Sequence, residues 1–219
     1  AYALPIHADE AKDKINEEKP PVSVKASNEL VSSYLFRGFK LSEGPAVRSE
    51  AKIESHGFSL GAIAIYDAKQ SVHNEVTTLA DYTKTFPGDI TATLGYAAIL
   101  HPNSEQKRTQ EIYAILGLNA VLNPSLSVFH DFDRGKGTYV ELGIKQEVPI
   151  GNITPVFGFL VGYKSHYFRK ESGFSHVDIS VGIPLQAGKW FTITPHVGYQ
   201  KGLGLGFEDA VHGGLRIEF

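Results

Sequence analysis

Apolar and polar residues alternate along most of this chain, from residue 22 to residue 219. Between residues 45 and 55 the charged side chains share one parity, and the apolar or small side chains share the other. Because successive side chains of a β-strand point to opposite faces, this segment is predicted to be a strand with one charged and one apolar face. The same division recurs in residues 139–148 and 208–219.

The alternation predicts twelve strands and no stable helix after residue 21. The connections after even-numbered strands are short, whereas those after odd-numbered strands are longer and charged. An even strand count with short turns at one end and longer loops at the other is typical of an outer-membrane barrel. We therefore predict an all-β, antiparallel, up-and-down transmembrane β-barrel over residues 22–219 with periplasmic termini. The strands are expected at residues 22–36, 45–55, 58–67, 74–86, 89–100, 108–122, 125–133, 138–148, 153–164, 174–183, 190–200 and 208–219.

Two segments invite a helical interpretation. The uncharged run 112–130 is long enough for a membrane-spanning helix, but Asn123-Pro124 interrupts it and alternation follows, which favours two strands and a turn. Residues 1–21 mix acidic and basic side chains ahead of Pro20-Pro21 with few apolar positions. We interpret them as a mobile periplasmic N-terminal tail, or as a plug if other parts of the protein hold them.

The alternation alone does not decide which face is outside, since a soluble barrel would place its apolar side chains inward. A ring of twelve strands encloses more space than the eight-stranded barrel whose side chains just fill it, which disfavours an apolar lumen. Aromatic residues on the apolar face also lie toward strand ends, as in the girdles of membrane barrels. They are Phe58, Tyr66, Tyr82, Phe86, Phe157, Tyr163, Phe191 and Tyr199.

Composition narrows the function classes. The 21 basic and 24 acidic residues give a net charge of −3, which argues against nucleic-acid binding. The absence of Cys excludes disulfide scaffolds, thiolate metal sites and Cys nucleophiles. Met is absent as well, and the start Ala1-Tyr2-Ala3 indicates an exported chain whose signal peptide has been cleaved.

Several short motifs resemble those of known outer-membrane proteins. Residues 212–219, which end in Phe219, resemble the C-terminal signal that the bacterial barrel-assembly machinery reads during biogenesis. The segment 33–38, Ser-Tyr-Leu-Phe-Arg-Gly, is similar to the TorF-like porin family, and 111–113 and 139–143 fall where that family has comparable strand motifs. The resemblance implies a Gram-negative outer membrane and a porin role, and it offers no catalytic residues.

If the charged parity faces the lumen, acidic residues outnumber basic ones there, and a water-filled lumen would favour cations. The alternative is that these charges pair across neighbouring strands and close the lumen. The candidate lumen or ion-pathway residues are Arg48, Glu50, Lys52, Glu54, Glu111, Glu141, Lys145, Glu147, Asp178, Arg216 and Glu218.

The longer loops are rich in basic residues and would form an outer rim. Such a rim would bind lipopolysaccharide phosphates or draw anionic solutes to the mouth, and the alternative is ordinary solvation of surface loops. The residues of this basic outer rim are Arg37, Lys40, Lys107, Arg108, Arg134, Lys136, Arg169 and Lys170.

Three histidines of inward parity, His176, His196 and His212, lie on consecutive predicted strands with Asp178 nearby. They are a candidate metal or proton cluster, the alternative being ordinary lumen histidines. We expect no resident cofactor.

An enzyme is disfavoured, because the chain lacks a His-any-Ser triplet, a His-Glu-any-any-His motif and a Gly-rich phosphate loop. The favoured function is a small passive pore or solute-uptake channel with an acidic lumen. The alternatives are a binding barrel for an apolar ligand such as a fatty acid, a closed structural barrel and, less favoured, an outer-membrane hydrolase. The solute and a homo-oligomeric state are left open.

Overall fold

The computed structural model describes residues 22–103, 108–204 and 206–219. The N-terminal tail or plug expected at residues 1–21 lies outside the described residues. Within the described ranges, no helix has the length and apolar character needed to cross a membrane.

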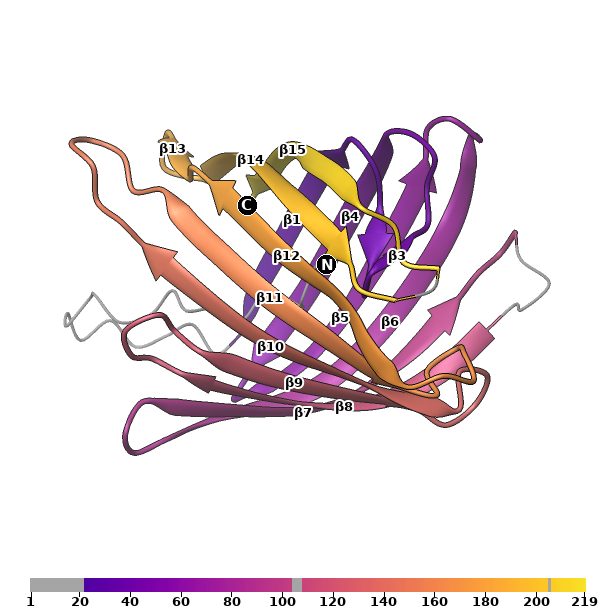
Figure 1. The fold of residues 1–219 in the computed structure, drawn as a ribbon. Coiled ribbons are helices and arrows are strands. Elements are labelled where there is room, and N and C mark those ends of the chain that lie inside the picture. The colour runs from indigo at the N-terminus through magenta and orange to yellow at the C-terminus, as the bar shows by residue number, and fades with distance from the viewer. Residues whose placement is uncertain (1–21, 104–107, 205) are drawn as a thin grey trace.

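The chain forms a closed antiparallel barrel of twelve strands, as the alternation predicts (Figure 1). Three further short strands, β2 (Leu35–Phe36), β3 (Phe39–Lys40) and β13 (Leu185–Ala187), lie in the connections. The barrel strands are β1 (Ser23–Val31), β4 (Ala46–Ser55), β5 (Phe58–Asp67), β6 (Val72–Phe86), β7 (Ile90–Leu100), β8 (Arg108–Leu118), β9 (Ser125–Asp131), β10 (Gly137–Glu147), β11 (Val156–Ser165), β12 (Gly173–Gly182), β14 (Phe191–Gly202) and β15 (Ala210–Glu218).

Closure comes from the pairing of the first and last barrel strands. β1 pairs with β15, with Ser27 opposite Glu218, and also with β4, so that both edges of the N-terminal strand are hydrogen-bonded. The Phe219 N–H donates to the carbonyl of Ala26 at 2.9 Å and extends this seam. A ring without free edges satisfies the backbone groups that lipid cannot.

The connections differ between the two ends of the barrel. At one end, which we call the short-turn end, β4–β5 and β6–β7 are joined by tight turns with Gly57 and Gly88 at positive φ. At the other end, the long-loop end, β1 stops at Val31 instead of residue 36, and the next fourteen residues form a loop that carries the β2–β3 hairpin. Elsewhere the predicted strand ends differ from the observed ones by a few residues.

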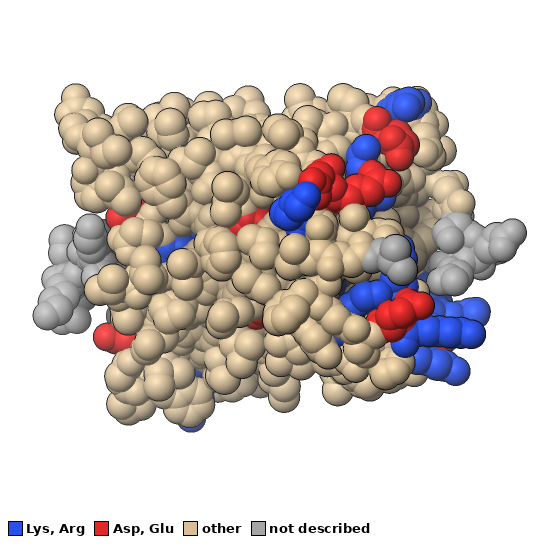
Figure 2. Space-filling model, viewed as in Figure 1, with Lys and Arg blue, Asp and Glu red and all other residues tan. Residues whose placement is uncertain are grey.

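The exterior of the barrel is apolar. Mid-strand side chains such as Leu60, Leu94 and Ile112 point outward and are more than half exposed. Of the aromatic residues expected on this face, Phe58, Tyr82, Phe86, Phe157, Tyr163, Phe191 and Tyr199 are exposed and Tyr66 is half-buried. The middle of the face in Figure 2 is largely free of charged side chains. This confirms the outward apolar face, removes the soluble-barrel alternative, and suits a barrel that spans a membrane.

The interior divides into two halves. Toward the long-loop end it contains a cluster of buried side chains that includes Ile65, Tyr113 and Tyr139. Toward the short-turn end the inward residues, such as Lys52, Glu54 and Glu218, remain partly exposed. The lumen is therefore filled at one end and more open at the other.

Candidate functional site: the lumen and its inward hairpin

The loop 32–45 folds into the barrel. Its turn is fixed locally, because the backbone N–H of Tyr34 donates to Ser42 Oγ at 2.6 Å and the N–H of Leu41 donates to the Tyr34 carbonyl at 2.8 Å. Leu35, in β2 of the hairpin, is only 1% exposed. Arg37 and Gly38 adopt positive φ values of 50° and 88°, which a tight two-residue turn requires.

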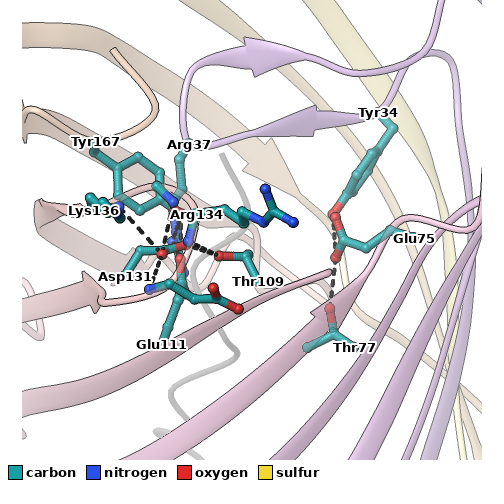
Figure 3. Close-up of polar contacts among 12 residues, drawn as sticks. Tyr34, Arg37, Glu75, Thr77, Thr109, Glu111, Asp131, Arg134, Lys136 and Tyr167 are labelled. Atoms are coloured by element: carbon teal, nitrogen blue, oxygen red, sulfur yellow. Dashed lines mark hydrogen bonds and ion pairs between the residues drawn. The ribbon is translucent and has the colours of Figure 1, made fainter. Parts of the chain in front are cut away.

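Arg37 anchors the hairpin to the far wall of the barrel (Figure 3). Its guanidinium donates to both carboxylate oxygens of Glu111, at 2.6 and 2.8 Å, and also contacts the Tyr167 hydroxyl. The Tyr167 hydroxyl donates to the same carboxylate, and the guanidinium carbon lies 3.9 Å from the centre of the Phe129 ring. The prediction that Arg37 belongs to the outer rim is therefore wrong. The apolar residues around Arg37 draw the loop into the lumen, where Glu111 supplies a buried partner.

The surroundings of Arg37 keep its guanidinium group ionised. Burial alone would lower the pKa of Arg37, but the adjacent Glu111 carboxylate raises that pKa above its usual range. Burial raises the pKa of the Tyr167 hydroxyl, so that Tyr167 stays a neutral donor to Glu111. A buried bidentate arginine–carboxylate pair is among the stronger contacts available to a loop.

Two further contacts hold the hairpin inside the barrel. The Gln200 side-chain amide of β14 donates to the Gly38 carbonyl at 3.0 Å. The Tyr34 hydroxyl lies 3.5 Å from both carboxylate oxygens of Glu75, which also accepts from Thr77 at 3.0 Å. A Cβ built on Gly38 would lie 2.7 Å from His176 Nδ1, so the hairpin tip packs against β12 closely enough to require glycine.

The hairpin leaves only a small cavity beneath it. This cavity has a volume of about 60 Å³ and lies between the hairpin and the wall. Carboxylates of Glu75, Glu111 and Glu141 and the guanidinium groups of Arg37 and Arg48 contribute to its lining. The space suits a few water molecules and is too small for an organic solute.

Ion pairs connect many of the charged residues along the lumen. Arg48 Nη2 lies 2.7 Å from Glu50 Oε2, Lys52 Nζ lies 3.1 Å from Glu54 Oε1, and Arg216 Nη2 lies 3.0 Å from Glu218 Oε1. All the candidate lumen residues have inward parity on their strands: Arg48, Glu50, Lys52, Glu54, Glu111, Glu141, Lys145, Glu147, Asp178, Arg216 and Glu218. Lys145 and Glu147, near the short-turn end, are exposed.

The lumen carboxylates are not all paired. Glu141 is buried and accepts a hydrogen bond from the Tyr139 hydroxyl at 3.0 Å. Within residues 22–103, 108–204 and 206–219, neither Glu141 nor Glu75 has a basic partner within 4.0 Å.

The three histidines do not form a metal site. His212 Nε2 lies 2.7 Å from Asp178 Oδ2, and His196 Nε2 lies 2.8 Å from Glu29 Oε1. His176 is buried beside the Ser175 hydroxyl and stacks on Tyr139. No group of three or more His, Asp or Glu side chains in the described part of the chain could hold a metal ion. Strand stagger therefore separates the three histidines and gives each its own partner.

The remaining rim residues lie at the long-loop end, apart from Lys107, which is outside the described residues. Arg108 begins β8 and lies 4.0 Å from Asp133, and Lys40 lies 3.4 Å from Glu43. Arg134 and Lys136 lie in the β9–β10 loop, and Arg169 and Lys170 lie in the β11–β12 loop.

Sequence reasoning missed the partners of the hairpin. Tyr167 and Gln200, which contact Arg37 and Gly38, are buried at the long-loop end of the lumen, and neither was expected there as a site residue. A signal was present in the sequence, because Leu35, Phe36 and Phe39 give the first loop an apolar character that a solvated loop does not need. That pattern indicates burial but does not identify the partner.

The fold and the site define a membrane-spanning β-barrel with a charged lumen and an inward-folded loop. A family model described as "Bacterial protein of unknown function (Gcw_chp)" matches residues 16–210, so the chain belongs to this family. The TorF-like resemblance is not confirmed by this match. No curated protein matches the chain.

Solved structures share the barrel fold. A structure titled "KdgM porin" is 14% identical with a TM-score of 0.61 and covers 89% of this chain and 98% of its own. A second, "KdgM porin in complex with disordered oligogalacturonate", has 14% identity, a TM-score of 0.58, and coverage of 90% and 97%. A NanC porin structure is 11% identical with a TM-score of 0.54 and coverage of 90% and 98%. At these identities the likeness shows the fold.

Proposed function

We propose that this protein is a channel for small polar solutes in the outer membrane of a Gram-negative bacterium. The observation that carries the proposal is the combination of an apolar exterior with a lumen wall of charged side chains. A barrel that only anchored or braced a membrane would have no need of so many ionisable groups inside, since burying charge is costly. The porin titles of the similar structures are in keeping with this function.

The inward hairpin makes the described conformation a closed one. The hairpin occupies the long-loop half of the lumen, and the cavity beneath it has a volume of about 60 Å³. Conduction in this proposal requires the β2–β3 hairpin to leave its position against Glu111. The β1–β4 loop is long enough to move without breaking the barrel ladder, because the hairpin pairs only with itself.

The lumen is proposed to favour cations. Acidic residues exceed basic residues on the inward parity of the strands, and Glu75 and Glu141 lack a basic partner among the described residues. Rings of carboxylates in a hydrated pore favour cations.

Of the two rival functions, the fatty-acid binder fits the geometry less well. A fatty-acid binder needs an apolar pocket of several hundred Å³, whereas the cavity beneath the hairpin is about 60 Å³ and has charged residues in its lining. A closed structural barrel is supported by the same hairpin, and only conductance separates it from a gated channel.

Single-channel recording in planar bilayers tests the channel. We expect discrete ohmic steps with a reversal potential that indicates cation preference. Glu75→Gln together with Glu141→Gln should shift the reversal potential toward that of a nonselective pore. The matched control Glu171→Gln, on an exposed loop residue, should leave it unchanged. If neither the wild type nor a variant that lacks the Arg37–Glu111 contact conducts, the result would instead support the structural barrel. Unchanged reversal potentials would contradict the acidic lumen.

A further inference from the structure

The β9–β10 and β11–β12 loops line an open surface hollow at the long-loop end. Its volume is about 350 Å³, and the charged residues in its lining are all basic. Figure 2 shows Lys and Arg side chains gathered at this end of the barrel. The lining consists of Arg134, Gly135, Lys136, His166, Phe168, Arg169 and Lys170.

Three of the four Lys and Arg side chains in this lining, Arg134, Lys136 and Lys170, form no ion pair with a described acid. Across the described ranges, their side-chain nitrogens form no ion pair within 4.0 Å, and Asp131 contacts only the backbone N–H of Lys136. Asp133, the acid next to Arg134 in sequence, is 4.0 Å from Arg108 instead. Unpaired positive charges converging on a concave surface produce a positive potential that attracts anions.

Backbone contacts hold the two loops in place. The Phe168 N–H donates to the Gly135 carbonyl at 3.2 Å, and the Gly135 N–H donates to Asp131 Oδ1 at 2.8 Å. Lys136, His166 and Phe168 adopt positive φ values of 43°, 58° and 50°. Such conformations persist only where surrounding contacts determine them. The hollow is therefore a formed surface, which lowers the entropic cost of binding a ligand.

The position of the hollow indicates the source of the anion. Three exposed aromatic residues adjoin the same loops in sequence: Phe132 follows β9, Tyr163 is near the end of β11 and Phe174 is near the start of β12. The Tyr163 and Phe174 rings are 5.6 Å apart. Exposed aromatic residues at strand ends mark the membrane interface. The basic residues lie just beyond that belt, at the level expected for lipid headgroups.

We propose that this hollow binds the phosphate groups of a glycolipid headgroup in the outer leaflet. Arg134 would bind a phosphate through its planar fork of donors, while Lys136 and Lys170 would contribute point charges. The proposal rests on the barrel's place in a membrane and not on its conductance, so the two can fail separately.

Native mass spectrometry of the full chain in detergent tests this site. The probe is a bisphosphorylated glucosamine-disaccharide lipid, compared with the same lipid after removal of its phosphates. We expect the wild type to retain the phosphorylated form selectively. Arg134→Gln with Lys136→Gln should weaken that retention about tenfold or more, since each lost contact is a charge-assisted one.

The matched control is Lys84→Gln with Lys189→Gln, which removes two exposed positive charges near the short-turn end. It should bind as the wild type does, and circular dichroism should show that both double variants are folded. Equal weakening by both double variants would overturn the site, as would equal retention of the dephosphorylated lipid. Displacement of the lipid by millimolar inorganic phosphate would overturn the lipid source and indicate a soluble anion.

Discussion

The sharpest prediction concerns the Arg37 anchor of the inward hairpin. Arg37→Met keeps the length and the apolar stem of the side chain but removes the guanidinium that contacts Glu111 at 2.6 and 2.8 Å. The Glu111 side chain is 0% exposed, so in the closed conformation the change leaves a buried carboxylate without its cation. Removing one partner of a buried ion pair costs about 3–5 kcal/mol.

That cost applies only while the hairpin stays in the lumen. When the hairpin leaves, water reaches Glu111 and the penalty is relieved, so the variant shifts the equilibrium toward the open conformation. At 1.4 kcal/mol for each factor of ten, the open-to-closed ratio shifts by about 10²-fold to about 4 × 10³-fold. The barrel strands are unchanged, so the melting of the barrel itself should move little.

Single-channel recording measures the effect. Arg37→Met should raise the open probability strongly, and the double variant Arg37→Met/Glu111→Gln should return part of the way to the closed state, because no buried charge is then left. The control Lys40→Met lies on the same hairpin but removes only a contact of 3.4 Å to exposed Glu43. The reasoning is refuted if Arg37→Met and Lys40→Met conduct alike.

Three further predictions concern the barrel. A Cβ on Gly95 would lie 2.2 Å from Tyr113 Cζ. Gly95→Val should therefore lower the free energy of unfolding in micelles by about 1–3 kcal/mol. A similar loss for Ala62→Val, which faces the lipid, would contradict this reasoning. Leu94→Lys should cost about 2–4 kcal/mol in bilayers, whereas Val121→Lys, in a turn, should cost almost nothing. The hydrogen bond from Lys201 lowers the pKa of Asp209 below 3.8. The Lys201–Asp209 pair therefore stabilises the folded state fully above pH 3.8, and this stabilisation is lost as the pH falls through the lowered pKa of Asp209 in the folded state. An NMR titration of the Lys201→Met variant should show that the Asp209 pKa rises.

The order of the strands and the two faces of the barrel were predictable because they depend on a local rule. A side chain's parity fixes its face, so Arg48 and Glu50 could be placed inward and Leu60 and Leu94 outward from their positions in the alternation alone. The expected girdle residues were found outside for the same reason, since the pleat repeats at every strand.

The tertiary structure alone decided where the first loop goes and which charges meet. Arg37 and Glu111 are 74 positions apart, and no local period relates them. A loop rich in aromatic and basic residues fits a membrane surface or a lumen, and its sequence does not distinguish the two. The closed ring decides by bringing Glu111, Tyr167 and Phe129 to one place. The histidines show the same limit, because parity gives the face of a strand, whereas the stagger between strands sets which partner each side chain can reach.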